Sequence, residues 1–185
     1  MGLDMMLYRK RYVKNWGLDE NRFEVILKKN GEEVPLENTV YILENIMYWR
    51  KANAIHNYFV HECGGCEDDC RPIYISTENL RELKRRIDTI LDTVTLTPGK
   101  VIVSYTFKNK KRVNNYEDGE VISRESDLEL CRKLLPTFSG FFFGNTEYDE
   151  GYIGSLKDTQ EMLADLMANP SWDNGDYDYE YRASW

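Results

Sequence analysis

The order of helical and strand-like segments limits the folds that this chain can adopt. Three segments carry apolar side chains at helical spacing: residues 39–60, which show the strongest pattern, 76–91 and 150–168. Three other segments read as strands: residues 3–13, 101–107 and 176–185. Helices and strands interleave without the regular strand–helix–strand repeat of a parallel sheet. The order therefore predicts an α+β fold with antiparallel sheets and hairpins.

Turn and cap signals mark where several of these elements begin and end. Asn30-Gly31 is a turn signal, Ser76 or Thr77 suits the start of the second helix, and Thr97-Pro98-Gly99 is expected to end it. Further elements are expected as follows: a strand at 23–28, a hairpin return through Asp118-Gly119 to 121–122, a short helix at 126–134, and a buried strand or tight apolar loop at 140–144.

The length fits one globular domain, residues 1–185, in which the sheet and hairpins pack with three to four helices. The chain is 42% hydrophobic and 30% charged, which is typical of a soluble protein. It has no apolar run of the roughly 18 residues that a membrane helix needs, and its N-terminus lacks the apolar core of a signal peptide. We therefore expect a cytoplasmic protein.

The segment HECGGCEDDC, residues 61–70, holds three of the four cysteines and one of the two histidines. In the cytoplasm, clustered cysteines indicate metal ligands before disulfides. Cys63 and Cys66 form a C-x-x-C pair with Cys70 close behind, and Gly64-Gly65 lets the backbone curl toward one centre. With His61 they make three thiolates and an imidazole, a common closed zinc set. The segment therefore predicts a structural zinc that pins the turn at 61–70.

The fourth zinc ligand is not fixed by spacing alone. His56 is an alternative to His61, but it would lie about 10 Å from Cys63 if that stretch stays helical. Asp68 or Asp69 could also supply an oxygen. Cys131 is remote in sequence and fits an ordinary buried thiol, but it stays open as a further ligand. A redox C-x-x-C is less favoured, because such a pair belongs at the start of a helix after a strand.

The C-terminal segment 145–180 is strongly acidic. It holds ten acidic residues against one basic residue, Lys157, within a chain of net charge -8. Such a segment attracts basic proteins and repels nucleic acid. The candidate partner-binding residues are Glu147, Asp149, Glu150, Asp173, Asp176 and Asp178. An alternative is that Glu147, Asp149 and Glu150 hold a divalent cation in a metal-dependent hydrolase.

Enzyme signatures are otherwise missing from the sequence. The chain has no P-loop, no G-x-G-x-x-G, no G-x-S-x-G and no H-E-x-x-H, and its two histidines leave little for acid–base chemistry. No catalytic residue is assigned, and a binding protein is favoured over an enzyme.

Several longer phrases resemble a family of small bacteriophage-encoded proteins whose usual opening is MGLDMYL. They are MGLDMMLYRKRYVKNW, IMYWRKANAIHNYFV, DDC at 68–70, LLPTFSGFFFGNTEYDEGYIGSLKDTQEML and the terminal YRASW, and together they cover most of the chain. The sequence departs from that family at Met6, where tyrosine is usual, and in HECGGC, where relatives have no C-x-x-C. The zinc site would then belong to a subgroup.

The sequence is also similar to zinc-containing type II-A anti-CRISPR proteins of streptococcal prophages. This resemblance implies a phage anti-defence protein that acts in the host cytoplasm, binds Cas9 and prevents target DNA engagement, without contacting nucleic acid or membrane itself. An acidic surface suits the positively charged channel of Cas9. The alternative is binding or degradation of a nucleotide immune signal, in a pocket of tyrosines with Arg81, Lys84 and Arg85.

Overall fold

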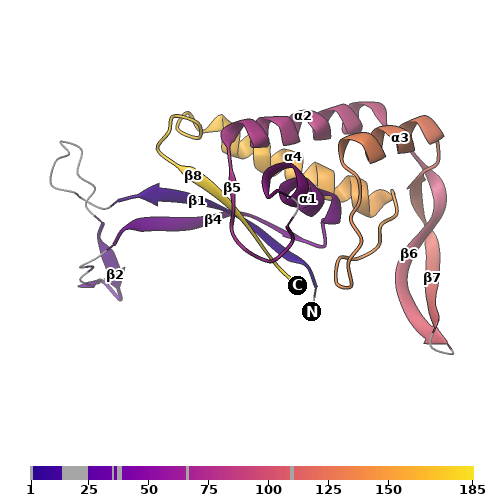
Figure 1. Cartoon of the computed structure of the whole chain (residues 1–185), viewed down its shortest axis with the longest axis horizontal. Coiled ribbons are helices and arrows are strands. Elements are labelled where there is room, and N and C mark those ends of the chain that lie inside the picture. The colour runs from indigo at the N-terminus through magenta and orange to yellow at the C-terminus, as the bar shows by residue number, and fades with distance from the viewer. Residues whose placement is uncertain (1, 14–24, 35, 37–38, 66, 109–110) are drawn as a thin grey trace.

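A computed structural model of the chain describes residues 2–13, 25–34, 36, 39–65, 67–108 and 111–185 (Figure 1). An antiparallel sheet of four strands forms its centre, in the order β4-β1-β8-β5. The strands are β1 (Asp4–Tyr12), β4 (Tyr41–Arg50), β5 (Ile73–Ile75) and β8 (Asp178–Ser184). The predicted α+β class, with antiparallel sheets and helices in a single domain, is confirmed.

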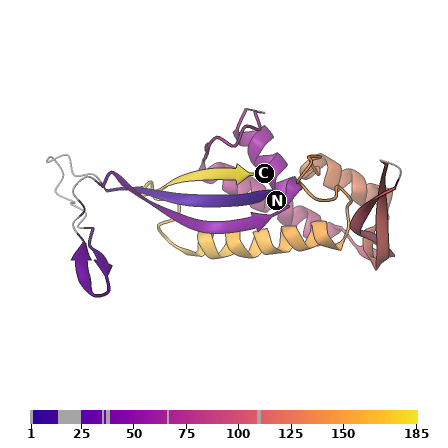
Figure 2. The same ribbon diagram turned by 90° about the horizontal axis from the view of Figure 1, so that it is seen from below.

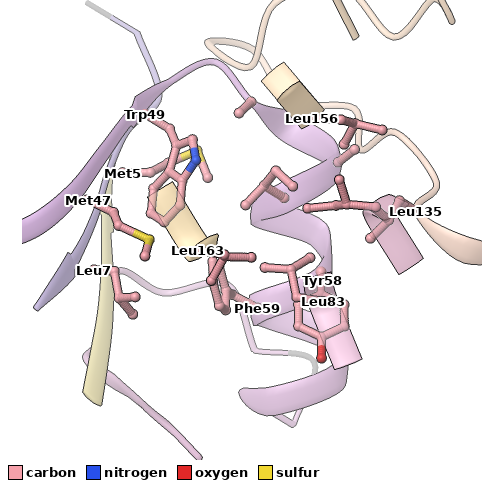
Figure 3. Packing of buried hydrophobic residues seen from close by; sticks show 14 of the residues in the cluster. Met5, Leu7, Met47, Trp49, Tyr58, Phe59, Leu83, Leu135, Leu156 and Leu163 are labelled. Atoms are coloured by element: carbon pink, nitrogen blue, oxygen red, sulfur yellow. The ribbon is translucent and has the colours of Figure 1, made fainter. Parts of the chain in front are cut away.

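The helices form a layer that packs along the central sheet (Figures 1 and 2). They are α1 (Asn53–Tyr58), the π-helical turn η1 (Phe59–Cys63), α2 (Thr77–Thr93), α3 (Glu125–Leu134) and α4 (Glu150–Ala168). Strand residues such as Met5, Leu7 and Trp49 face helix residues such as Phe59 and Leu163 in one core (Figure 3). Trp49 also donates a hydrogen bond of 2.8 Å to the Thr159 hydroxyl of α4.

The prediction of one helix across 39–60 is wrong for its first half, because residues 41–50 form β4. That strand pairs antiparallel with β1, and it buries Met47 and Trp49 while the intervening Tyr48 is half exposed. The apolar positions between 42 and 49 fit either periodicity. Aromatic and β-branched side chains favour the strand, and pairing with β1 satisfies its backbone groups. The helix begins only at Asn53.

Two hairpins extend from opposite ends of the body (Figure 1). The smaller joins β2 (Leu27–Lys29) to β3 (Glu32–Val34). Its turn residues Asn30 and Gly31 both have positive φ, 54° and 88°, as a tight hairpin turn requires, so the predicted turn is confirmed. The larger is a long ribbon of β6 (Leu96–Lys108) and β7 (Lys111–Ile122).

The ribbon differs from the predicted hairpin in where its glycines lie. α2 ends at Thr93, and Pro98-Gly99, which was expected to end it, lies inside β6. Asp118-Gly119 lies inside β7 and not at a turn. A Cβ atom on Gly99 would come within 2.4 Å of a Val121 methyl group. Glycine is therefore needed there for close approach of the strands and not for a turn.

The strand predicted at 23–28 is found only from Leu27, where β2 begins, and residues 23 and 24 lie outside the described part of the chain. The other elements follow the predictions more closely. Ser76 caps α2, and α4 and β8 lie where expected. The segment 140–144 is a loop rather than a strand; it buries Phe143 and leaves Phe141 85% exposed. No helix in the described part of the chain is long and apolar enough to cross a membrane.

Candidate functional site

The cysteine segment follows directly from the helix that starts at Asn53. Cys63 ends η1 with its thiol half-buried, and this burial, with the charge of Glu62, raises its pKa to about 12. Cys70 is exposed, has a positive φ of 62°, and lies beside the backbone of Trp185. The two thiols thus have different neighbours: Cys63 lies near Arg86 of α2, and Cys70 lies near the C-terminal Trp185.

The predicted zinc ligands are not assembled by the described residues. Cys66 lies outside them, and His61 is an exposed residue whose ring packs edge-on against Phe138 at a centroid distance of 5.2 Å. Among the residues that the structure describes, no group of three or more His, Cys, Asp or Glu is placed to hold a metal ion. Zinc bound by Cys63, Cys66, Cys70 and His61 therefore stays a prediction.

His56, the alternative zinc ligand, is fully buried beneath the cysteine segment. Its Nδ1 lies 2.7 Å from the Tyr181 hydroxyl of β8, and its Nε2 lies 3.1 Å from Asp68 Oδ2. Both ring nitrogens thus have a side-chain partner within the fold. The chain Tyr181–His56–Asp68 ties the cysteine segment to the central sheet, a role that spacing in the sequence did not reveal.

We expect acid to destabilise the fold through His56. Burial lowers the pKa of His56 below its ordinary 6.5, although the Asp68 carboxylate opposes this. The unfolded chain therefore takes up this proton first as the pH falls, so stability present above about pH 6.5 is lost below it, by at most about 1.4 kcal/mol per pH unit. Melting temperatures between about pH 8 and pH 5 test this. His56→Gln should flatten the dependence, and an equal acid loss in both proteins would contradict it.

Loss of a predicted zinc ligand should also destabilise the fold. A zinc ion bound only by the folded chain adds its binding free energy to the free energy of unfolding. We therefore expect Cys66→Ser to lower the melting temperature by about 10 °C or more, and elemental analysis to find one zinc per wild-type chain. Cys131→Ser, which changes a buried cysteine outside the segment, is the control for metal content. Metal-free wild-type protein of unchanged stability would contradict the zinc prediction.

Two acids of the segment 147–150 have structural roles. Asp149 is 3% exposed and caps α4: its Oδ1 accepts hydrogen bonds from the backbone N–H groups of Gly151 and Tyr152, at 2.9 and 3.1 Å. Glu150 accepts from the backbone N–H of Glu120 at 3.0 Å and so fixes the ribbon to α4. The Asp149 carboxylate is therefore not available to a partner protein.

The other predicted partner-binding residues do not share one face. Glu147 and Glu150 lie at the start of α4, whereas Asp173, Asp176 and Asp178 follow its end (Figure 1). The 19 residues of α4 separate the two groups, a length of about 28 Å. Asp173 pairs with Arg81, and Asp176 lies 3.5 Å from the Arg11 guanidinium. Part of the counted charge is therefore neutralised within the fold.

The solvent face of α4 carries a row of acidic residues that was not among the predicted partner-binding residues. Asp158, Glu161 and Asp165 are all exposed, and their spacing of three and four residues places them on one side of the helix. None of the three has an ion pair among the described residues. The predicted helix at 150–168 already places these three acids on one side, so the row could have been predicted from the sequence. We call Asp158, Glu161 and Asp165 the acidic row.

The basic residues expected to bind a nucleotide are paired with acids instead. Lys84 lies 2.8 Å from Asp88, Arg85 lies 2.7 Å from Glu82, and Arg81 pairs with Asp173. They border a shallow hollow of about 310 Å³ that has no tyrosine in its lining. This surface offers little uncompensated positive charge to a phosphate.

Comparison with known proteins adds no relative. No protein-family model, no curated protein and no solved structure matches the chain. The resemblance to bacteriophage proteins stays an expectation from the sequence, and function has to be argued from the residues and their geometry.

Proposed function

We propose that the protein is a binding inhibitor that docks its acidic row on a basic, nucleic-acid-binding partner. The observation that carries this proposal is that some acidic residues form ion pairs within the fold and others do not. Asp173 and Asp176 are paired within the fold, whereas Asp158, Glu161 and Asp165 project from α4 without an ion pair among the described residues. Carboxylates that lack an internal partner keep their charge available for an external one.

The geometry of the row suits a groove that normally holds a nucleic acid backbone. The three carboxylates span eight residues of helix, about 10 Å, so they present several negative charges along one line. A rigid helix holds this row in place without the entropy loss that ordering a loop would require. A positively charged channel, such as the one in which Cas9 holds its guide–target duplex, is a matching surface.

The sequence resemblance narrows the partner to a Cas9-type effector of the host. A structural zinc in the cysteine segment is part of the same proposal, since it would stabilise the fold without taking part in binding. The engagement of Asp149 and Glu150 in helix capping and ribbon attachment favours binding over hydrolysis, because these two carboxylates belong to the alternative hydrolase set.

Co-elution in size-exclusion chromatography tests the proposed binding. We expect the protein to co-elute with Cas9, with or without guide RNA, near physiological ionic strength, and to dissociate as salt rises. Exposed charges are screened over about 8 Å at that ionic strength and over shorter distances at higher salt. No complex with several Cas9 orthologues, even at low salt, would overturn the partner assignment.

A further inference from the structure

A pocket of about 430 Å³ lies beside the start of α4, where four segments meet. They are the turn from β4 into α1, the middle of β6, the loop at 137–147 and the first turns of α4. The volume is within the range of about 300–1,000 Å³ that is typical of small-ligand sites. No predicted function makes use of this pocket except through Glu147 and Asp149, which contribute to its lining.

Lys51 lines this pocket and has an unusual backbone conformation. Its φ is 59°, in the left-handed region that a residue with a side chain rarely adopts. The chain is held there by two hydrogen bonds, from Lys51 N to Leu3 O at 2.8 Å and from Asn53 N to Lys51 O at 2.9 Å. Strained residues of this kind concentrate at functional sites.

Two glycines lie close to the Lys51 side chain. A Cβ atom on Gly2 would lie 3.3 Å from Lys51 Cε, and one on Gly144 would lie 3.5 Å from Lys51 Cβ. Gly144 has a φ of 89°, so it also needs the freedom of glycine. Lys51 is exposed, and its ammonium group has no ion pair among the described residues. The lysine is thus positioned by the fold without an internal counterion.

The rest of the lining defines what could occupy the pocket. Its apolar part is formed by Ile102, Val103, Phe141, Phe142 and Leu156. Arg50 also borders it, but its Nε lies 4.0 Å from Asp4 Oδ1 and so has a partial counterion. Glu147 and Asp149 border the pocket too, and their carboxylates would repel a second anionic group on a ligand.

We propose that this pocket binds a small molecule with an apolar or aromatic body and one anionic group, for which Lys51 is the counterion. The body contacts the apolar lining, and the carboxylate or phosphate lies against the Lys51 ammonium at the rim. Ser104 belongs to the same lining, and its hydroxyl, which accepts from Asn115 Nδ2 at 2.9 Å, can donate to a polar edge of the ligand. This site is separate from the acidic row and does not rest on the proposed binding to Cas9.

Fluorescence titration with anilinonaphthalene sulfonate, an aromatic probe with one anionic group, tests the site. We expect Lys51→Met, which keeps most of the stem and removes the charge, to weaken binding about tenfold or more. Lys157→Met removes an exposed lysine from the solvent side of α4 and should leave the affinity unchanged. Ser155→Trp should fill the pocket and abolish binding. Equal affinity of wild type and Lys51→Met, or full binding by Ser155→Trp, would overturn the proposal.

Competition with charged and uncharged pairs then identifies the ligand body. Adenosine monophosphate is compared with adenosine, and naphthoate with naphthylmethanol, as displacers of the probe from wild-type protein. We expect the anionic member of at least one pair to displace the probe at a concentration about tenfold lower than its uncharged counterpart. The effective pair distinguishes a nucleotide from an aryl carboxylate. Equal displacement by charged and uncharged members of both pairs would contradict a counterion role for Lys51.

Discussion

Replacing Asn53 by alanine should lower the free energy of unfolding by about 3–5 kcal/mol. Asn53 is 6% exposed and makes three hydrogen bonds to the backbone of the loop that borders the pocket. Its Nδ2 donates to Phe143 O at 3.0 Å and to Asn145 O at 2.7 Å, and its Oδ1 accepts from Phe138 N at 3.2 Å. Alanine would leave all three backbone groups without this partner, and each such group costs about 1–3 kcal/mol when it stays buried.

Asn57 provides a matched control for this prediction within the same helix. Its Nδ2 makes one hydrogen bond, to Pro136 O at 2.9 Å, at an exposed position. We expect Asn57→Ala to cost less than about 1 kcal/mol. Urea unfolding of the two variants and the wild type measures the difference. A similar loss of unfolding free energy in Asn53→Ala and Asn57→Ala would show that the three hydrogen bonds of Asn53 contribute less to stability than we expect.

Reversing the charge of the acidic row should weaken the complex with Cas9 by about 100-fold or more. The variant carries Asp158→Lys, Glu161→Lys and Asp165→Lys, all at exposed positions of α4, so the core under the helix is unchanged. Each new lysine would face a basic surface, and like charges brought together across an interface cost up to several kcal/mol. Melting temperatures should stay close to that of the wild type, because exposed charges contribute little to stability.

The control for charge reversal changes three other exposed acids by the same amount. Asp92→Lys, Glu117→Lys and Glu129→Lys shift the net charge equally but lie on α2, β7 and α3. Surface plasmon resonance of both triple variants against immobilised Cas9 separates a local contact from an effect of total charge. The control should bind within a few-fold of wild type. Equal losses in the two variants would mean that net charge, and not the acidic row, drives association.

Elements whose signals are local could be predicted from the sequence. The start of α2 follows from Ser76, whose hydroxyl accepts from Asn79 N while the Asn79 side chain accepts from Ser76 N. The tail was predicted as a strand, and β8 forms there with Tyr179 and Tyr181 buried. In each case the residues that decide the structure lie within a few positions of one another.

Elements that depend on distant partners could not be predicted in the same way. The spacing of apolar residues in β4 fits a helix equally well, and pairing with β1, whose partner residues lie 29 to 46 positions away, decides for the strand. The acidic residues of 145–180 can be counted from the sequence, but pairing of Asp173 with Arg81 and of Asp176 with Arg11 depends on the folded chain. The pocket at Lys51 has no sequence signal, because it is built from four separate segments.

Target DNA cleavage by a Cas9–guide complex, with and without this protein, is the most direct test of the proposed inhibition. We predict that preincubation at a near-stoichiometric ratio suppresses cleavage, and that guide and target stay intact when incubated with this protein alone. Suppression should be lost in the variant with the reversed acidic row. Unimpaired cleavage across several Cas9 orthologues, or degradation of guide or target by the protein itself, would contradict the assignment as a binding inhibitor.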